Sequence, residues 1–286
     1  MTIQSAFTQI AQAIQPLYEP REAQNIANMI CEHITGFGKM DRMVHKDDVL
    51  DPTQVQSLQA AVEALLGGQP VHYVIGRNWF YGMEFFVNEH VLIPRPETEE
   101  LVEWVVKEVK ASGTKAARII DVGTGSGCIP VALKKELPDA VIQAIDISEE
   151  ALAVARQNAA TQQTEIFFEQ MDALDPSATG TLSTFDVIVS NPPYILESER
   201  AGMMEQVANH EPPIALFVPN NDALLFYRAI GLMAQQKLVP GGKLFFEINE
   251  AMGPETLELL IDQGFNKVML KQDLYGRDRM IFAIKD

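Results

Sequence analysis

Residues 118–127 read Arg-Ile-Ile-Asp-Val-Gly-Thr-Gly-Ser-Gly, an apolar run that leads into a glycine-rich loop. The run predicts a buried strand, and the residues after it predict a helix that begins near Cys128. Glycine at positions 123, 125 and 127 permits a tight turn with positive φ and lets a ligand approach the backbone closely. A strand, a glycine loop and a helix in this order predict the first unit of a parallel α/β sheet.

The same alternation of short apolar runs and amphipathic helices continues to the end of the chain. It predicts a doubly wound, mostly parallel sheet with right-handed crossovers. The last two candidate strands are separated only by residues 271–278, too few for a helical crossover, so an antiparallel pair is expected at the end of the sheet. The seven candidate strands are 118–122, 141–146, 165–170, 185–190, 243–248, 267–270 and 279–284.

The first 75 residues differ from the rest, because their apolar residues recur at helical spacing, as in Phe7, Ile10 and Ile14. Residues 1–75 are therefore predicted to form a small helical domain. Its last long helix is expected to begin at Asp51-Pro52, a capping residue before a proline, and to end at Gly67-Gly68. Residues 76–94 predict a linker with an aromatic-rich hairpin, and residues 95–286 form the expected α/β domain.

The chain is acidic, with 22 basic against 39 acidic residues and a formal net charge of −17. Binding to duplex DNA depends on Lys and Arg that neutralise phosphates, and no dense basic cluster is present. The charge therefore weighs against an enzyme that acts on DNA and against direct contact with nucleic acid. An acidic surface also serves solubility without implying a partner.

Cysteine and histidine usage predicts neither disulfides nor a structural metal. The only cysteines are Cys31 and Cys128, and the five histidines are scattered singly rather than at metal-ligand spacing. Cys128 stands at a helix N-terminus, where thiolate character is favoured, but without a local partner it is expected to pack in the core. No apolar run approaches the roughly 20 residues that a membrane span needs, and the first residues lack signal-peptide character. A cytoplasmic location is expected.

Doubly wound sheets bind ligands at the carboxyl ends of their strands, which directs attention to the residues found there. Asp146 ends the second candidate strand, where a carboxylate can accept from both hydroxyls of a ribose, or can instead cap the next helix. Asp172 follows the third strand and is placed to accept from an adenine amino group. The same positions would suit a nicotinamide dehydrogenase. The predicted ligand-binding residues of this group are Gly123, Thr124, Gly125, Ser126, Gly127, Asp146 and Asp172.

Asn191-Pro192-Pro193-Tyr194 follows the fourth candidate strand and points to a specific chemistry. An amide or aromatic amino nitrogen holds its lone pair in resonance, so its attack on a methyl donor requires a site that grips its hydrogens. The Asn191 side-chain oxygen and the Pro192 carbonyl can accept those hydrogens, while Pro193 restricts the turn. Tyr194 offers a flat face to a planar group. The motif favours methyl transfer to a planar nitrogen, although an ordinary Asn-Pro turn has the same composition.

Taken together, these motifs resemble the release factor glutamine methyltransferases, the HemK-type family. These enzymes use S-adenosylmethionine to methylate the glutamine of the Gly-Gly-Gln loop in peptide chain release factors. The resemblance extends over most of the chain. It rests on Gly76, residues 80–82, the segment Ile93-Pro94-Arg95-Pro96-Glu97-Thr98-Glu99, residues 121–127, 191–194, 211–212, 215–216, 226–228, 240–242, 273–276 and Arg279.

The resemblance implies a Rossmann-like S-adenosylmethionine-dependent methyltransferase domain behind a helical domain that grips the protein substrate. It implies catalytic roles for Asn191, Pro192 and Tyr194, with Asn191 contacting the donor as well and Pro193 contacting the substrate. It also places Arg95, Pro96 and Glu97 at the pocket entrance, where the alternative is a simple helix start. The implied cofactor is S-adenosylmethionine with S-adenosylhomocysteine as product, and no metal is expected.

Two positions depart from the family pattern, Asn249 and Ala223, where glycine is usual. Asn is the residue other than glycine that most often adopts left-handed backbone, so the loop at Asn249 is expected to keep its shape. The implied partner is a release factor, whose basic faces suit an acidic, monomeric enzyme of translation termination. The alternatives are glutamine methylation of a ribosomal protein, adenine N6-methylation of DNA and a donor-binding module without turnover. Residues 195–213 are expected to form a loop over the substrate or a long surface connection.

Overall fold

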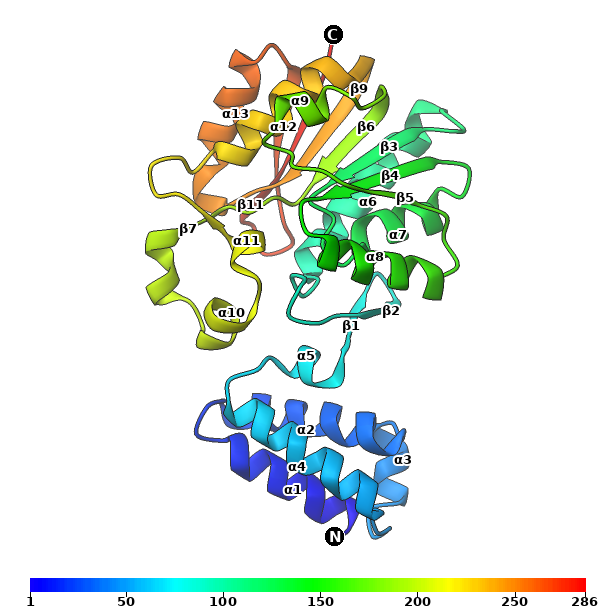
Figure 1. Ribbon diagram of the computed structural model, residues 1–286, viewed down its shortest axis with the longest axis vertical. Helices are drawn as coiled ribbons and strands as arrows, with labels where there is room; N and C mark the ends of the chain where they lie inside the picture. Colours follow the sequence, from blue (N-terminus) through cyan, green and yellow to red (C-terminus); the bar gives the residue numbers. More distant parts are fainter. The chain divides into compact units, whose positions relative to one another are not determined.

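The computed structural model describes all 286 residues, which form two compact units. The first unit contains residues 1–77 together with Met204–His210, and the second contains residues 78–203 and 211–286. None of the helices combines the length and the apolar character that a membrane-spanning segment requires. Figure 1 shows the N-terminal helices, coloured blue to cyan, and a unit built on one large sheet.

The first unit is an all-helical bundle whose helices begin and end at the residues that local chemistry favours. In α4, Asp51 forms a capping box with Gln54, Pro52 occupies the first turn, and the helix ends at Gly67. Ile10, Ile14 and Ile30 are fully buried in its core. Its elements are α1 (Ile3–Ile14), α2 (Pro20–Thr35), α3 (Lys39–Val44), α4 (Pro52–Leu66), α5 (Val71–Ile75) and α10 (Glu205–His210).

The second unit contains a seven-stranded sheet with the order β10-β11-β9-β6-β3-β4-β5. The strands from β9 to β5 pair in parallel, and β11 is antiparallel to both β9 and β10, which confirms the predicted terminal pair. The large-sheet strands are β3 (Arg118–Val122), β4 (Val141–Asp146), β5 (Phe167–Gln170), β6 (Phe185–Ser190), β9 (Leu238–Glu247), β10 (Asn266–Gln272) and β11 (Asp278–Ile284).

Four of the seven strands, β5, β9, β10 and β11, differ from their predicted bounds, and the reasons are identifiable for β9 and β5. Strand β9 begins at Leu238 rather than at residue 243, because Gly241 adopts φ 76° and lets the chain pass an irregularity in the pairing with β6. Strand β5 begins at Phe167 rather than at residue 165. It is an edge strand, and its pairing with β4 begins at Phe167 opposite Gln143.

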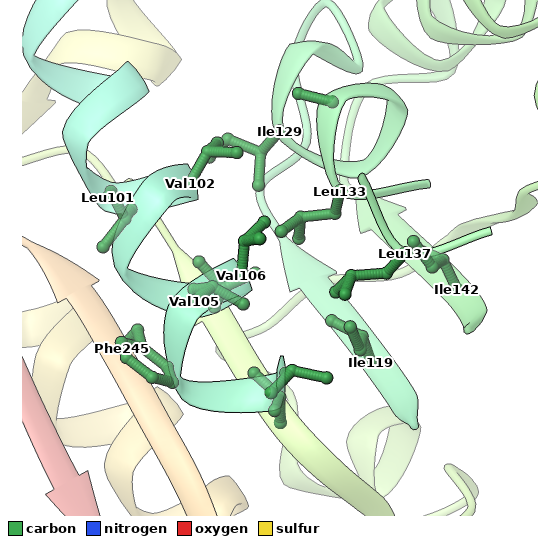
Figure 2. Close-up of a cluster of buried hydrophobic side chains, with 14 of the residues drawn as sticks. Leu101, Val102, Val105, Val106, Ile119, Ile129, Leu133, Leu137, Ile142 and Phe245 are labelled. Carbon is green, nitrogen blue, oxygen red and sulfur yellow. The ribbon is translucent and has the colours of Figure 1, made fainter. Parts of the chain in front are cut away.

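Helices cover both faces of the sheet, so side chains alternate between two apolar cores (Figure 1). Ile119 and Phe245 face the helices α6 (Pro96–Ser112) and α7 (Cys128–Glu136), where Leu101, Val105 and Leu133 point toward them (Figure 2). Ile120 and Phe246 face the opposite core. The remaining helices of this unit are α8 (Glu149–Thr161), α9 (Pro176–Thr179), α11 (Pro213–Leu216), α12 (Leu225–Lys237) and α13 (Gly253–Asp262).

The predicted hairpin in residues 79–87 is confirmed as β1 (Arg77–Phe80) and β2 (Met83–Phe86). Tyr81 and Gly82 both have positive φ, 52° and 70°, which is the tight turn that suits the twist of paired strands. Residues 195–213, expected as a loop, instead contain regular structure. They comprise β7 (Ile195–Leu196), which pairs with β8 (Phe217–Val218), the 3-10 helix η1 (Glu197–Gly202), α10 and the start of α11.

Candidate active site

The sheet order brings the three predicted loops together at the carboxyl ends of neighbouring strands. Strand β3 lies between β4 and β6, so the glycine loop after β3 has neighbours at the carboxyl ends of both. Val122 pairs with Ser190, and therefore Gly123 and Asn191 are the next residues on adjacent strands. The chain leaves β3 toward β4 and later returns to the other side of β3. This is the position at which doubly wound sheets bind ligands.

A cavity of about 240 Å³ lies at this edge. Apolar side chains such as Ile147, Met171 and Phe226 form part of its wall. Of the predicted site residues, Gly127, Tyr194, Pro96 and Glu97 do not line it. Those that do are Arg95, Gly123, Thr124, Gly125, Ser126, Asp146, Asp172, Asn191, Pro192 and Pro193.

The three glycines of the loop have positive φ but serve two purposes. A Cβ at Gly123 or Gly125 would meet nothing within 4 Å, so these residues leave the cavity side of the loop open. A Cβ at Gly127 would lie 3.0 Å from the Ala155 Cβ on α8. Gly127 is therefore required for close packing of the loop against α8, whereas Gly123 and Gly125 leave room for a ligand.

Asp146, at the end of β4, holds the glycine loop in place. Its Oδ2 accepts from the Gly125 N–H at 2.8 Å, and its Oδ1 accepts from the Ser148 N–H at 3.0 Å. Burial raises the pKa of Asp146, and these backbone hydrogen bonds oppose the rise. The N-cap of α8 is the Ser148 side chain rather than Asp146. The carboxylate thus remains on the cavity wall, where each oxygen retains acceptor capacity for a ligand hydroxyl.

Asp172 lies beyond β5 and also lines the cavity. Its Oδ1 accepts from the Leu174 N–H at 2.8 Å, which closes a local turn. Because β4 and β5 are neighbours, Asp146 and Asp172 stand at adjacent strand ends. Together they place two carboxylates along one side of the cavity.

Asp121, on β3 just before the loop, is a polar residue in an apolar setting. Its side chain is fully buried, and neither carboxylate oxygen has a hydrogen-bond partner. Burial raises the pKa of Asp121 to about 7, the Thr124 side chain lowers it without completing a hydrogen bond, and the Asp146 charge raises it further. An unpaired buried carboxylate is costly, so its position directly below the glycine loop is a mark of function rather than of stability.

Asn191 follows β6 and reaches α6 across the edge of the cavity. Its Nδ2 donates to the Thr98 Oγ1 at 3.2 Å. No group of the chain donates to the carbonyl oxygen of Pro192. The two acceptors that the sequence identified, the Asn191 Oδ1 and the Pro192 carbonyl, therefore remain free of protein donors. Whether they bind a substrate amide stays a prediction.

Tyr194 packs against the core that contains Tyr227 and Phe246, and it does not line the cavity. Its hydroxyl donates to the Glu247 Oε1 at 3.3 Å. Burial and the Glu247 charge raise the pKa of the Tyr194 hydroxyl, so this group remains a donor. The stacking role expected for Tyr194 stays a prediction. The structure adds a second role, the hydrogen bond that the Tyr194 hydroxyl donates to Glu247.

Thr98 and Glu247 are site residues that sequence reasoning missed. Both are buried, and the Thr98 hydroxyl donates to the Glu247 Oε2 at 2.6 Å. Burial raises the pKa of Glu247, while the Thr98 hydrogen bond and the Arg279 charge lower it. The sequence held one sign that Glu247 belongs to the site: it is an acidic residue at the end of the apolar run that forms β9, the strand that pairs with β6.

Arg95 is held at the cavity wall by Glu211, another residue that was not predicted as part of the site. The Arg95 Nη2 lies 2.5 Å from the Glu211 Oε1, and the Glu211 side chain is 1% exposed. The Glu211 Oε2 also accepts from the Ile93 N–H at 3.2 Å. Pro96 and Glu97 occupy the first turn of α6, as expected for the simple helix start. Within the proposed entrance segment, Arg95 alone faces the cavity.

Asn249 does not use the left-handed backbone that asparagine tolerates. Asn249 has φ −64° and ψ 128°, an extended conformation that any residue adopts. Its side chain accepts from the Ala251 N–H at 3.0 Å and donates to the Tyr194 carbonyl at 3.2 Å. Asn249 therefore supports the turn that contains the Asn-Pro-Pro-Tyr motif. Ala223 also lacks a positive φ, so neither departure from the family pattern demands glycine.

Cys128 packs in the core as expected, and burial raises the pKa of its thiol to about 12. A thiol with this pKa stays protonated at neutral pH, which excludes a thiolate nucleophile at this site. The structure contains no group of three or more His, Cys, Asp or Glu residues arranged to hold a metal ion.

Two family models match the chain. The Methyltransferase small domain matches residues 98–211, which include the loops after β3, β4 and β6. The PrmC N-terminal domain matches residues 6–76, which cover most of the helical unit.

Comparison with known proteins gives relatives over nearly the full length. The chain is 42% identical to the release factor glutamine methyltransferase of Flavobacterium psychrophilum, with 98% of both chains covered. It is 41% identical to the release factor glutamine methyltransferase of Bacteroides thetaiotaomicron, over 96% of this chain and 97% of the relative. A methyltransferase structure from Pyrococcus furiosus aligns with a TM-score of 0.51 at 18% identity, covering 79% of this chain and 97% of its own. That structure shows the fold alone.

Proposed function

The chain belongs to the release factor glutamine methyltransferase family, and from this membership we propose its reaction and its substrate. It methylates the side-chain amide nitrogen of the glutamine in the Gly-Gly-Gln motif of peptide chain release factors, with S-adenosylmethionine as donor. The observation that carries the proposal is the position of Asn191, which lines the same cavity as the glycine loop and keeps its Oδ1 unpaired.

The residues around the cavity fit the donor. Asp146 and Asp172 provide acceptors at adjacent strand ends for hydroxyl and amino groups, and Met171 and Phe226 provide apolar wall for a planar ring. The open side of Gly123 and Gly125 is a cradle that a Cβ would fill. When bound, S-adenosylmethionine supplies an electrophilic methyl group on a sulfonium, and S-adenosylhomocysteine remains after transfer.

The chain contributes orientation and electrostatics. The Asn191 Oδ1 and the Pro192 carbonyl accept the two hydrogens of the glutamine amide, which raises electron density on its nitrogen and directs the lone pair at the methyl group. Alignment of reacting atoms supplies about 7–11 kcal/mol in favourable cases. No strong base is needed before attack, because the amide nitrogen becomes acidic only once it is methylated.

The partner is a protein with a basic surface. The formal net charge of −17 favours encounter with release factors, which bind ribosomal RNA and carry basic faces. The proposal includes a substrate-gripping role for residues 1–75, a linker in residues 76–94 and a catalytic domain in residues 95–286. It also includes a monomeric enzyme in the cytoplasm with no direct contact to nucleic acid.

Mass spectrometry of release factor provides the test. Release factor is incubated with the enzyme and S-adenosylmethionine, digested, and the peptide that contains Gly-Gly-Gln is analysed. The proposal predicts addition of one methyl group at the glutamine, and Asn191→Ala serves as the control that strongly slows this addition.

Labelled donor separates the alternatives. A ribosomal protein fraction and duplex DNA are incubated in parallel with release factor. Transfer to a ribosomal protein glutamine or to adenine, with none to release factor, would overturn the proposed substrate. Donor binding without transfer to any of the three would identify a module without turnover.

A further inference from the structure

Three polar side chains from distant parts of the sequence form a hydrogen-bond chain behind Asn191. Thr98 lies in the first turn of α6, Glu247 ends β9, and Asn191 follows β6. The Thr98 Oγ1 is 2.6 Å from the Glu247 Oε2 and 3.2 Å from the Asn191 Nδ2. Thr98 is 3% exposed and Glu247 is 1% exposed, so water does not compete for these groups.

The direction of each hydrogen bond follows from which of the three side chains carry protons to donate and which carry only acceptor lone pairs. An ionised carboxylate only accepts, so the single Thr98 proton is directed to Glu247. The Thr98 oxygen then has lone pairs alone to offer, and Asn191 must present its NH₂ group to Thr98. Its carbonyl oxygen is consequently the end left for a ligand.

The opposite arrangement would defeat the proposed chemistry. If the Thr98 hydroxyl donated to Asn191, the side-chain amide would be flipped. The Asn191 NH₂ group would then face the cavity in place of the Oδ1 acceptor. A glutamine amide offers N–H donors, so two sets of donors would then face each other. A buried donor without an acceptor is costly, because it has lost its hydrogen bonds to water.

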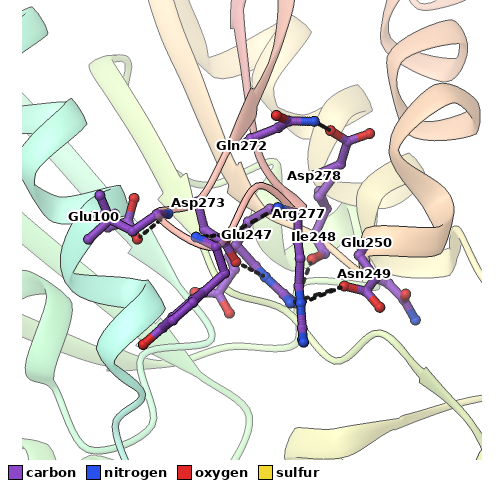
Figure 3. A network of polar contacts seen from close by, with 12 residues as sticks. Glu100, Glu247, Ile248, Asn249, Glu250, Gln272, Asp273, Arg277 and Asp278 are labelled. Atoms are coloured by element: carbon purple, nitrogen blue, oxygen red, sulfur yellow. Dashed lines mark hydrogen bonds and ion pairs between the residues drawn. The ribbon is translucent and has the colours of Figure 1, made fainter.

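Burial raises the pKa of Glu247, and the polar groups around it oppose this rise and favour the ionised form that accepts hydrogen bonds. The Tyr194 hydroxyl donates to its Oε1 at 3.3 Å, and the nearby Arg279 guanidinium is positively charged. Arg279 forms ion pairs with Asp273 at 3.6 Å and with Glu250 at 3.8 Å. Glu247, Glu250 and Asp273 lie in one network of polar contacts (Figure 3). The hydrogen-bond chain from Glu247 to Asn191 is therefore linked to this network through the Arg279 charge.

We propose that Thr98 is a positioning residue: by accepting from the Asn191 NH₂ group, it directs the Asn191 carbonyl oxygen to the cavity. Glu247 sets the direction in which the Thr98 hydroxyl donates. This inference rests on the proposed function, because the selected face is the one that accepts the hydrogens of a glutamine amide. Thr98 acts through Asn191.

The test compares Thr98→Val, which removes the hydroxyl at nearly constant shape, with Thr98→Ser, which keeps it. Thr98→Val is expected to lower kcat about a hundredfold, as misplacement of a reacting group does. The KM for release factor and the Kd for S-adenosylmethionine stay within about twofold, and Thr98→Ser restores most of the rate. Unchanged kcat in Thr98→Val, or a loss carried by KM or Kd, would overturn the inference.

Two further measurements exclude a merely structural effect. In the Asn191→Ala background, Thr98→Val should cause no additional loss of rate, whereas a full additional loss would show that Thr98 acts independently. In the free wild-type protein, NMR should show slowed exchange of the Asn191 side-chain NH₂ protons, assigned by their absence in Asn191→Ala. Thr98→Val should accelerate that exchange. This second readout requires no methyl transfer, so failure of the hydrogen-bond chain and failure of the proposed substrate are distinguishable.

Discussion

Replacement of Asp121 by asparagine should stabilise the free protein, and by an amount that grows with pH. The pKa of Asp121 rises from 3.8 in the unfolded chain to about 7 in the folded protein, mainly because of burial. The folded state therefore holds its proton over a range in which the unfolded state has lost it. The free energy of unfolding falls as pH increases through this range, in contrast to the usual behaviour of a salt-bridged carboxylate.

The size of the effect follows from the shift. Each pKa unit corresponds to about 1.36 kcal/mol, so a shift of about three units destabilises the folded state by about 4 kcal/mol above pH 7. Between about pH 5.5 and pH 8 the change amounts to about 2 kcal/mol. The asparagine side chain of the Asp121→Asn variant does not titrate, and the stability of this variant relative to wild type should increase by that amount across this interval.

Urea denaturation at constant ionic strength, followed by the fluorescence of the buried Trp104, measures this difference in the sheet unit. Asp139→Asn, a change at an exposed carboxylate, is the matched control and should show no such trend. A difference between wild type and Asp121→Asn that stays constant from about pH 5.5 to pH 8 would refute the reasoning. So would a variant that is less stable than wild type at the upper end of this range.

Three further outcomes are expected. Asn191→Ala should lower kcat/KM for release factor about 10²–10³-fold, the usual effect of removing one preorganised hydrogen-bonding group, and calorimetry should show donor affinity within about twofold of wild type. Gly127→Ala should lower the free energy of unfolding by about 2–4 kcal/mol, because Gly127 has φ 78° and a Cβ there would lie 3.0 Å from α8. Gly123→Ala should lower it by only about 1–2 kcal/mol, because Gly123 has φ 75° but open space around it. Equal losses in chemical denaturation would contradict this difference. Asn249→Gly should lower the melting temperature by the equivalent of about 1 kcal/mol, since the Tyr194 carbonyl loses its donor, and an unchanged melting temperature would argue against that support.

Much of the fold was predictable because its signals are local. The bounds of β3, β4 and β6 agree with the predicted strands, since apolar runs bounded by Gly, Pro and Asp mark them clearly. The capping box at Asp51 and the helix end at Gly67 follow from the conformational preferences of single residues. The glycine loop and the Asn-Pro-Pro-Tyr motif were recognised for the same reason, and the structure places both at one cavity.

The remaining parts depend on contacts between residues that are far apart in the chain. Thr98 and Glu247 are separated by 149 positions and Thr98 and Asn191 by 93, so no periodicity or motif connects them. Glu211 likewise reaches Arg95 across 116 positions. The assignment of Met204–His210 to the helical unit is a third example.

Residue types and their local order were sufficient to predict the sheet, the helical unit and the loops that line the cavity. Strand order and register were required to show which amide face of Asn191 is free, and that Asp121 is buried without a partner. The physical reason is that secondary structure responds to neighbours along the chain, whereas burial and hydrogen-bond direction respond to neighbours in space. The candidate site is therefore encoded locally in its motifs and completed only by the packing of α6 and β9 behind them.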